Sequence, residues 1–251
     1  MRYFLEVCYK GTNFNGFQIQ NTGKTIQGEI QNALLKLLKD PIILTGSSRT
    51  DAGVHALQNY FHFDIAGAFP MGKVYNLNSM VSPDIVIKRI VEVGAEAHAR
   101  FDANTREYKY YIHQSKNPFI QDTSYYYPYT MDWDKLKAAT ALVLGRHDFS
   151  SFSKKNTQVN NHFCEIFKAE WSMDNEQIVF NIRGNRFLRG MVRALVATLL
   201  KVGRGYFSFD DFAAILAAHD CTKADFSAPG KGLFLVEVAY PTEVITPSPV
   251  M

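Results

Sequence analysis

The sequence predicts an α+β protein built from two subdomains. Strand-like and helix-like stretches alternate along the 251 residues, and the two halves of the chain hold similar series of them. These strands offer mostly antiparallel pairings, which favours an α+β fold. The composition is that of an ordinary globular chain, with 47% hydrophobic and 20% charged residues, so a substantial core can form.

The first half contains one clear helix among strands. Its apolar side chains recur on one face at helical spacing: Ile26, Ile30, Ala33, Leu34, Leu37 and Leu38. Apolar and polar residues alternate at 60–65, as in a strand with one buried face. The predicted elements of this half are a strand at 3–9, a helix at 25–40, a short buried strand at 41–46, and strands at 60–65 and 85–93.

The second half predicts more helix. Asp132 stands where an N-cap is expected, and Ser208 with Asp211 three places on has the spacing of a capping box. The predicted elements are a strand at 106–113, a helix at 132–145, a strand at 178–184, helices at 187–203 and 208–219, and a strand at 233–240.

Charge and cysteine content exclude several classes of protein. The net charge of +3 is compatible with a polyanionic partner but does not require one. Cys8, Cys164 and Cys221 form no CxxC pair and no Cys/His ligand spacing, so we expect reduced core thiols and no metal. The N-terminus lacks the features of a signal peptide, and no apolar run approaches the roughly 20 residues that span a bilayer. These patterns predict a soluble, cytoplasmic protein.

A polar segment at 47–56 separates two apolar runs and contains Arg49 and Asp51. Residues two apart in an extended loop point the same way, so both side chains could face one cleft. A nearby guanidinium favours the ionised carboxylate, which can then act as a nucleophile or as an electrostatic stabiliser. The alternative is an Asx-turn in which Asp51 bonds the backbone near Gly53 while Arg49 is solvated.

Two further groups could contribute to a site. On a helix at 187–203 and its approach, Arg186, Arg189 and Arg193 fall on one face, and Arg193 borders an apolar stretch where a guanidinium needs a carboxylate or phosphate partner. The alternative is a solvated basic face. Tyr108, on the strand at 106–113, could stack on an unpaired RNA base, or it could be an ordinary packing residue.

These segments together resemble a known family. The segment SRTDAGVHA resembles the signature around the catalytic aspartate of the TruA family of tRNA pseudouridine synthases. HARFDA, REYKYYI, GRHDFSSF, FLRGMVR and APGKGLFLV resemble the family's other landmarks and follow in the expected order. The resemblance extends over nearly the whole chain, to about Tyr240.

The resemblance implies a reaction and a set of site residues. Asp51 matches the nucleophile, and the uracil is released, turned and rejoined to the ribose through C5. Attack at C1′, attack on the base and elimination to a glycal are all compatible with the motif. Tyr108 matches the tyrosine that stacks on the substrate base, Arg193 is similar to the residue that pairs with the aspartate, and Arg49 to the arginine that intrudes where the nucleotide flips out. Arg189 is expected to help bind the substrate, and no cofactor is needed.

The family also implies an architecture and a substrate. It implies two ferredoxin-like (RRM-like) subdomains, 1–104 with the aspartate loop and 105–251, whose sheets join around a central basic cleft. It further implies a homodimer that modifies uridines 38–40 in the anticodon stem-loop of tRNA. The chain departs from the common family pattern at Ser48, Gln58 and Gly190, which affects the expected loop geometry more than the expected activity.

Two other functions remain compatible with the residues. One is an RNA-binding module without chemistry. The other is a nucleoside or sugar hydrolase that uses Asp51, but glycoside hydrolysis normally needs a second carboxylate across the bond, and the sequence contains no partner motif for it.

Overall fold

The computed structural model of the chain describes residues 1–155 and 159–245. It confirms the α+β class and divides into two compact units. Unit 1 comprises Met1–Thr105 and the C-terminal segment that begins at Phe234, and unit 2 comprises Arg106–Leu233. The first boundary lies one residue from the expected division at 104/105. The observed division differs in the last strand, which was expected in the C-terminal half but belongs to unit 1.

Unit 1 is a mostly antiparallel sheet with two helices. Along the sheet the strand order is β4-β1-β3-β10, with β2 also paired to β3. β10 runs parallel to β3 through the pair Phe234↔His55, and this pairing brings the C-terminal strand into unit 1. The elements are β1 (Arg2–Tyr9), α1 (Ile26–Leu38), β2 (Thr45–Gly46), β3 (His55–Asp64), α2 (Val74–Met80), β4 (Ile85–Val93) and β10 (Leu233–Ala239).

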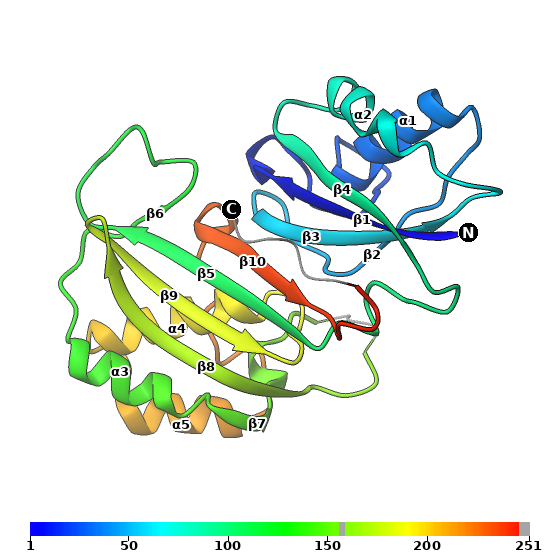
Figure 1. Ribbon diagram of the computed structural model, residues 1–251. Helices are drawn as coiled ribbons and strands as arrows, with labels where there is room; N and C mark the ends of the chain where they lie inside the picture. The colour runs from blue at the N-terminus through cyan, green and yellow to red at the C-terminus, as the bar shows by residue number, and fades with distance from the viewer. Residues whose placement is uncertain (156–158, 246–251) are drawn as a thin grey trace. The chain divides into compact units, whose positions relative to one another are not determined.

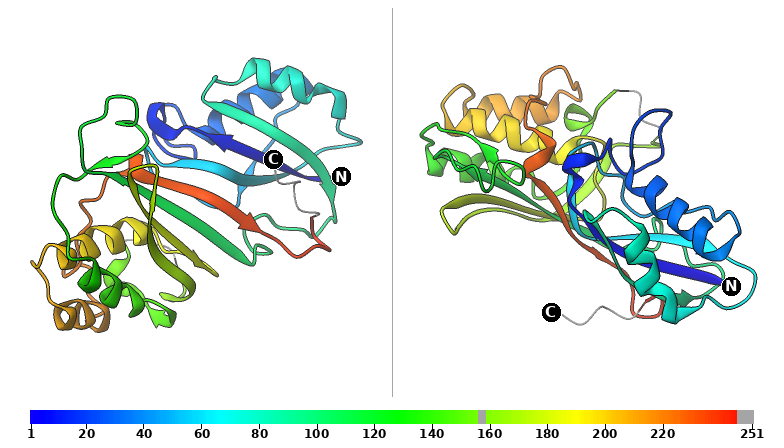
Figure 2. Two further views of the ribbon diagram at one scale, coloured as in Figure 1. Left: turned by 60° about the vertical axis from the view of Figure 1, so that its left-hand side comes forward. Right: turned by 90° about the horizontal axis from the view of Figure 1, so that it is seen from above.

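Both helices of unit 1 lie on the same face of the sheet, beside β1 and β4, as Figures 1 and 2 show. The helix predicted at 25–40 is confirmed as α1, and the Thr25 side chain caps it by accepting from the N–H of Gly28 at 3.2 Å. α2 was not predicted, because this short helix lies in a Pro-, Gly- and Asn-rich passage. The buried residues of α1 are Ile26, Ile30, Ala33 and Leu34.

Two strand predictions in unit 1 need correction. The short strand expected at 41–46 is reduced to β2, although its side chains still alternate, with Leu44 2% and Ile43 81% exposed. The strand expected at 60–65 with one buried face is the longer β3 (His55–Asp64), and both of its faces are buried. Tyr60 and Phe61, on opposite faces of β3, are 2% and 0% exposed. The face with Tyr60 is covered by the ring of Tyr240, edge-on at 5.1 Å.

Two histidines fasten the segment that begins at His98 to β3. His62 Nδ1 accepts a hydrogen bond from the backbone N–H of Ala99 at 3.1 Å, and His98 Nδ1 accepts one from Arg100 N–H at 3.1 Å. The two rings meet edge-on with centroids 4.5 Å apart. An imidazole nitrogen accepts only when it carries no proton, so protonation at either Nδ1 breaks these bonds. Burial, followed by the charges of His98 and Arg2, lowers the pKa of His62 to about 4.

Acid is therefore expected to destabilise the protein through His62. As the pH falls, the unfolded chain binds this proton first, because its histidine pKa is near 6.5 while that of the folded state is about 4. The stabilising contribution is complete above about pH 6.5 and is lost down to about pH 4, by an amount on the order of 2–3 kcal/mol. Urea unfolding between pH 7.5 and 4.5 measures it. The free energy of unfolding of a His62→Phe variant should depend less on pH than that of the wild type. An unchanged pH slope in this variant would contradict the prediction.

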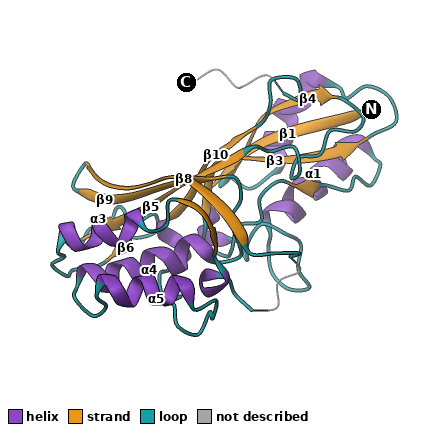
Figure 3. Ribbon diagram, turned by 90° about the horizontal axis from the view of Figure 1, so that it is seen from below, coloured by secondary structure: helices purple, strands orange, loops and turns teal. Residues whose placement is uncertain are grey.

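Unit 2 has strand order β5-β9-β8-β7, with β6 paired to β5. The pairs β5–β9, β9–β8 and β8–β7 are antiparallel. Figure 3 shows α3, α4 and α5 together on one face of these strands. The elements are β5 (Thr105–His113), β6 (Tyr125–Tyr126), α3 (Trp133–Ala141), β7 (Gly145–Asp148), β8 (Phe163–Asp174), β9 (Gln177–Gly184), α4 (Met191–Gly203) and α5 (Phe209–Ala217).

Local signals in unit 2 are confirmed at the helix caps. Asp132 accepts from the backbone N–H groups of the first turn of α3 at 3.1 Å. Ser208 and Asp211 form the predicted capping box at α5. β8 was not predicted, because the two-residue turn that joins it to β9 contains no glycine. Asn175 and Glu176 instead adopt positive φ angles of 46° and 65°, the backbone of a tight hairpin turn.

Cysteines and hydropathy complete the description of the fold. All three cysteines are free thiols, but only Cys164 is buried while Cys8 and Cys221 are half-buried, so the expectation of core positions holds for one of them. Burial raises the pKa of the Cys164 thiol to about 11. Within residues 1–155 and 159–245, no helix combines the length and the apolarity needed to cross a bilayer.

Candidate active site

Residues 47–54 of the polar segment form the loop that joins β2 to β3 in unit 1, and His55 and Ala56 begin β3. The first residue of the loop still belongs to the sheet, since Ser47 N–H donates to Tyr60 O at 2.8 Å. The next carbonyl, Ser48 O, accepts from the side-chain amide of Asn59 at 2.8 Å. Asn59 is fully buried on β3, so the loop is fastened to the strand that follows it.

A tight turn presents the aspartate. Val54 N–H donates to Asp51 O at 3.2 Å, and Gly53 inside this turn has φ +73°, a left-handed conformation that glycine adopts without strain. Asp51 is half-buried and Arg49 is exposed. The loop thus holds one carboxylate at its apex with partial access to solvent, which is what a nucleophile requires.

A buried set of polar groups, formed by Tyr9, Thr50 and Asn59, holds the residue before the aspartate. The hydroxyls of Tyr9 and Thr50 lie 2.8 Å apart, and the Asn59 amide donates to the Tyr9 hydroxyl at 3.1 Å. All three residues are at most 8% exposed. Sequence reasoning missed this set; the available signal was Asn59, an amide directly before the aromatic residues Tyr60 and Phe61.

The segment at residues 11–17 packs directly against the loop. A Cβ on Gly11 would lie 2.0 Å from Val54 O, and one on Gly16 would lie 3.1 Å from Thr50 O. Gly11 N–H also donates to His55 Nδ1 at 3.1 Å. His55 is 1% exposed and stacks on Phe234 at 4.4 Å, so this histidine of the motif supports packing.

Gly11→Ala is expected to displace the aspartate loop. The added Cβ meets backbone that cannot rotate away, which costs about 1–3 kcal/mol as overpacking and moves Asp51 from its position. Turnover should fall by more than the loss of folded protein accounts for. Gly72→Ala is the matched control, because its Cβ would meet nothing within 4 Å. Equal turnover in both variants at a temperature where both are folded would contradict the expectation.

In unit 2, Tyr108 lies on the helix-covered side of β5. Its ring meets Phe187 edge-on with centroids 5.1 Å apart, and its exposed fraction is 9%. The expectation of an exposed stacking tyrosine is therefore not met in this structure. Tyr108 and Tyr110 share one face of the strand, because residues two apart on a strand point the same way.

Arg193 and Tyr110 fasten the same dipeptide. Arg193 Nε donates to Ala228 O at 2.7 Å, and the Tyr110 hydroxyl donates to Pro229 O at 2.8 Å. Burial raises the pKa of Tyr110 above its usual range, so its hydroxyl remains a donor. The APGKG landmark is thus held between α4 and β5. Sequence reasoning gave Tyr110 no role in the site, although it lies two residues from Tyr108 on the same strand.

The arginine face predicted for the helix at 187–203 is wrong. α4 begins at Met191, and its N-cap Gly190 has φ 76° and ψ 0°, so Arg186 and Arg189 precede the helix. Only Arg193 lies on α4, where it is half-buried, while Arg189 is exposed. The left-handed backbone at Gly190 explains the break, since only Gly and, less often, Asn or Asp adopt it readily.

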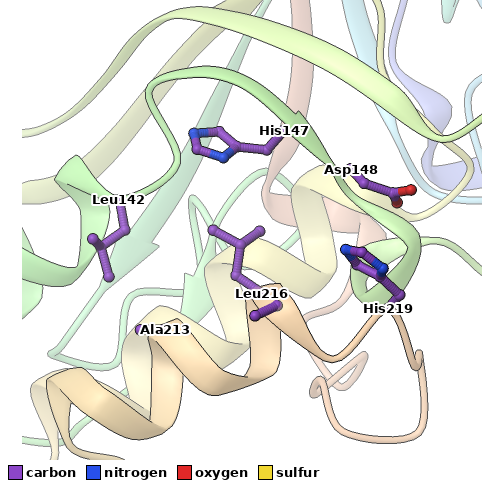
Figure 4. A pocket seen from close by; sticks show the side chains of 7 residues that line it. Leu142, His147, Asp148, Ala213, Leu216 and His219 are labelled. Atoms are coloured by element: carbon purple, nitrogen blue, oxygen red, sulfur yellow. The ribbon is translucent and has the colours of Figure 1, made fainter.

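A hollow of about 240 Å³ in unit 2, shown in Figure 4, is separate from these residues. Two of its polar lining residues are engaged locally. His147 Nε2 lies 2.7 Å from Leu144 O, and Asp148 accepts from the backbone N–H of Ser150 at 2.8 Å. Asp148 therefore closes a local turn in the GRHDFSSF segment. In the described part of the chain, no three His, Cys, Asp or Glu side chains converge as metal ligands would.

Comparison with known proteins gives consistent matches. A family model described as tRNA pseudouridine synthase matches residues 138–241. A Parabacteroides distasonis protein named tRNA pseudouridine synthase A is 44% identical over 247 residues, 97% of each chain. The Bacteroides fragilis protein of that name is 44% identical over 97% of this chain and 98% of its own. The Bacillus pumilus protein of that name is 39% identical over 96% of this chain and 99% of its own.

The family model and these relatives together place the chain in the pseudouridine synthase class. Within that class, identity of this level over nearly the whole length is decisive, and the chain belongs to the tRNA pseudouridine synthase A family. The resemblance of its motifs to this family is therefore confirmed.

Proposed function

We propose that the protein is an isomerase that converts uridine to pseudouridine in tRNA. The observation that carries the proposal is the 44% identity over 97% of the chain to a protein named for this activity. The rigidly held aspartate loop supports it, because a turn fastened by buried side chains from β1 and β3 is a suitable mount for one reactive carboxylate.

The reaction conserves all atoms of the nucleoside. The C1′–N1 bond breaks, a C1′–C5 bond forms, C5 loses its proton, and N1 gains one. No electron acceptor and no group donor are required, so we propose that the enzyme needs no cofactor. Base rotation requires the uridine to leave its stack, which costs a few kcal/mol and least where the base is loosely held.

We assign the central role to Asp51 as the nucleophile. The support is its place in RTDAGVHA, the partial exposure of its side chain, and the density of bonds that fix the residues around it. Attack at C1′ of the ribose, attack on the base and elimination to a glycal remain the routes to be distinguished.

Arginines and a tyrosine complete the proposed site. Tyr108 is assigned to stacking on the target base, which requires its ring to become accessible when RNA binds. Arg193 is assigned to pairing with Asp51, and its fixed guanidinium, bonded to Ala228 O, supports a positioning role. Arg49 is assigned to the space left by the flipped nucleotide. Arg189 is assigned to RNA binding, supported by its exposure.

The proposed substrate is uridine at positions 38–40 of the tRNA anticodon stem-loop, modified in the cytoplasm by a homodimer. We further propose that the two units are ferredoxin-like (RRM-like) subdomains around a basic cleft. The order β-α-β-β-α-β from β1 to β4, with strands arranged β4-β1-β3-β2, supports this for unit 1, since it is the ferredoxin-like arrangement.

Release of tritium from tRNA transcribed with [5-³H]uridine tests the proposal, because C5 loses its proton only if the isomerisation proceeds. The purified protein should release tritium in the presence of EDTA, and carbodiimide mapping should place the product at positions 38–40. Absence of release from tRNA that the protein binds would leave an RNA-binding module instead. Release of free uracil would indicate a hydrolase.

A further inference from the structure

A second hollow in unit 2 is rich in tyrosine and has a volume of about 390 Å³, within the range of small-molecule sites. It is formed by β6 and the residues after it, the C-terminal end of α4, and the segment that precedes the APGKG landmark. No step of the proposed isomerisation uses it. Its lining residues are Tyr125, Tyr127, Tyr129, Ala197, Leu200, Lys201, Arg204, Tyr206, Asp225 and Ser227.

Arg204 is held in this hollow by aromatic rings. Its guanidinium carbon lies 3.6 Å from the ring centroid of Tyr129, 4.8 Å from that of Tyr206 and 5.9 Å from that of Tyr127. Such cation–π contacts attract a cation to the face of an aromatic ring. Planar cationic and aromatic surfaces of this kind are the usual platform for an unstacked nucleobase.

The charged side chains that line the hollow, Lys201, Arg204 and Asp225, sum to a net positive charge. Lys201 Nζ is paired with Asp225 Oδ2 at 2.9 Å, and this carboxylate is only 14% exposed. Among the described residues, no carboxylate lies within ion-pair distance of Arg204. The groups that raise its pKa are the hydroxyls of Tyr127, Tyr206 and Tyr129. A guanidinium with this environment suits a phosphate diester, which supplies the missing negative charge.

The rim of the hollow is open to a ligand. Tyr206 is 67% exposed and Tyr129 is 44% exposed. Gly205, with φ +78°, ends the helical backbone directly before Tyr206 and directs the chain away from α4. Large exposed aromatic side chains lose packing energy unless a partner covers them, so this rim is suited to a flat apolar surface.

We infer that the tyrosine–arginine hollow binds a nucleotide of the tRNA that is not the one isomerised. Its base stacks on Tyr206 or Tyr129, and its phosphate meets Arg204. At about 1.5 Å per helical residue, Arg204 lies roughly 16 Å along α4 from Arg193. The nucleotide in the hollow is therefore several nucleotides away from the uridine that is isomerised near Arg193. The inference rests on the proposed function for the identity of the RNA, but its test uses binding as the primary readout.

Tyr206→Ala tests the inference in the full-length protein. The dissociation constant for unmodified tRNA, measured at fixed salt, should rise roughly tenfold, since each base stacked on an aromatic ring contributes about that factor. Tyr206→Phe should bind like the wild type, because the ring is retained. At saturating tRNA, kcat should stay within about twofold while KM rises. Tyr75→Ala on α2, 79% exposed, is the matched control and should change neither value.

Each outcome decides a separate point. If Tyr206→Ala binds tRNA as the wild type does, the inference is overturned and the proposed function is untouched. If the wild type binds tRNA but forms no pseudouridine, while Tyr206→Ala binds more weakly, the inference stands and the proposed activity fails. If weaker binding accompanies dissociation of an oligomer, the hollow contacts a second copy of the chain and the inference is again overturned.

Discussion

Asp51→Asn is expected to reduce pseudouridine formation by more than about a thousandfold. The amide keeps the size and the hydrogen-bonding shape of the carboxylate but is not a nucleophile, so the step that forms a bond to the substrate is lost. The turn that presents residue 51 is closed by a backbone bond to Val54, which the substitution leaves in place. Folding and tRNA affinity should therefore remain close to those of the wild type.

The measurement is tritium release under single-turnover conditions, with tRNA binding measured in parallel. Asp40→Asn is the control, because Asp40 is an exposed aspartate of the same unit and its loss should not affect turnover. Residual activity within tenfold of the wild type would remove Asp51 from the role of nucleophile. Loss of binding together with turnover would assign it to substrate recognition.

Arg89→Met is expected to cause the largest loss of stability. Arg89 Nε bonds Glu6 Oε2 at 2.7 Å, and the Glu6 side chain is only 1% exposed. Removing the guanidinium leaves a buried carboxylate without its cation, which costs about 3–5 kcal/mol. For a domain of this size the melting temperature should fall on the order of 10 °C.

Thermal and urea unfolding measure this loss. Lys88→Met provides the control, because Lys88 is the exposed neighbour on β4 and its replacement should change stability by less than about 0.5 kcal/mol. The double variant Glu6→Leu/Arg89→Met should recover most of the stability, since it removes the unpaired charge. A double variant that is less stable than Arg89→Met alone would contradict this explanation.

Gln58 shows how a departure from the family pattern is accommodated. Its side-chain amide donates to Glu6 Oε1 at 3.0 Å, and its Oε1 accepts from Val238 N–H at 3.0 Å. It also donates to the hydroxyl of Tyr60, whose pKa is raised to about 12, chiefly by burial. The half-buried side chain of Gln58 thus connects β1, β3 and β10.

Local patterns in the sequence predicted most elements correctly. The apolar face of α1, the N-cap at Asp132 and the capping box at Ser208 depend on residues within one or two turns of each other, so spacing alone reveals them. Predictions failed where one backbone angle decided the outcome. The left-handed Gly190 makes α4 begin after Arg189, and the left-handed pair Asn175–Glu176 turns the chain between β8 and β9 without a glycine.

The sequence by itself determined the α+β class, the order of most helices and strands, and the motifs that identify the family, because each of these is encoded within a short stretch of chain. Only the tertiary structure decided that β10 belongs to unit 1, that Tyr108 is buried, and that Tyr9, Thr50 and Asn59 meet behind Asp51. These features depend on contacts between residues up to about 180 positions apart, which no local periodicity can specify. The sequence therefore located the carboxylate, and the fold supplied the buried side chains that hold it in place.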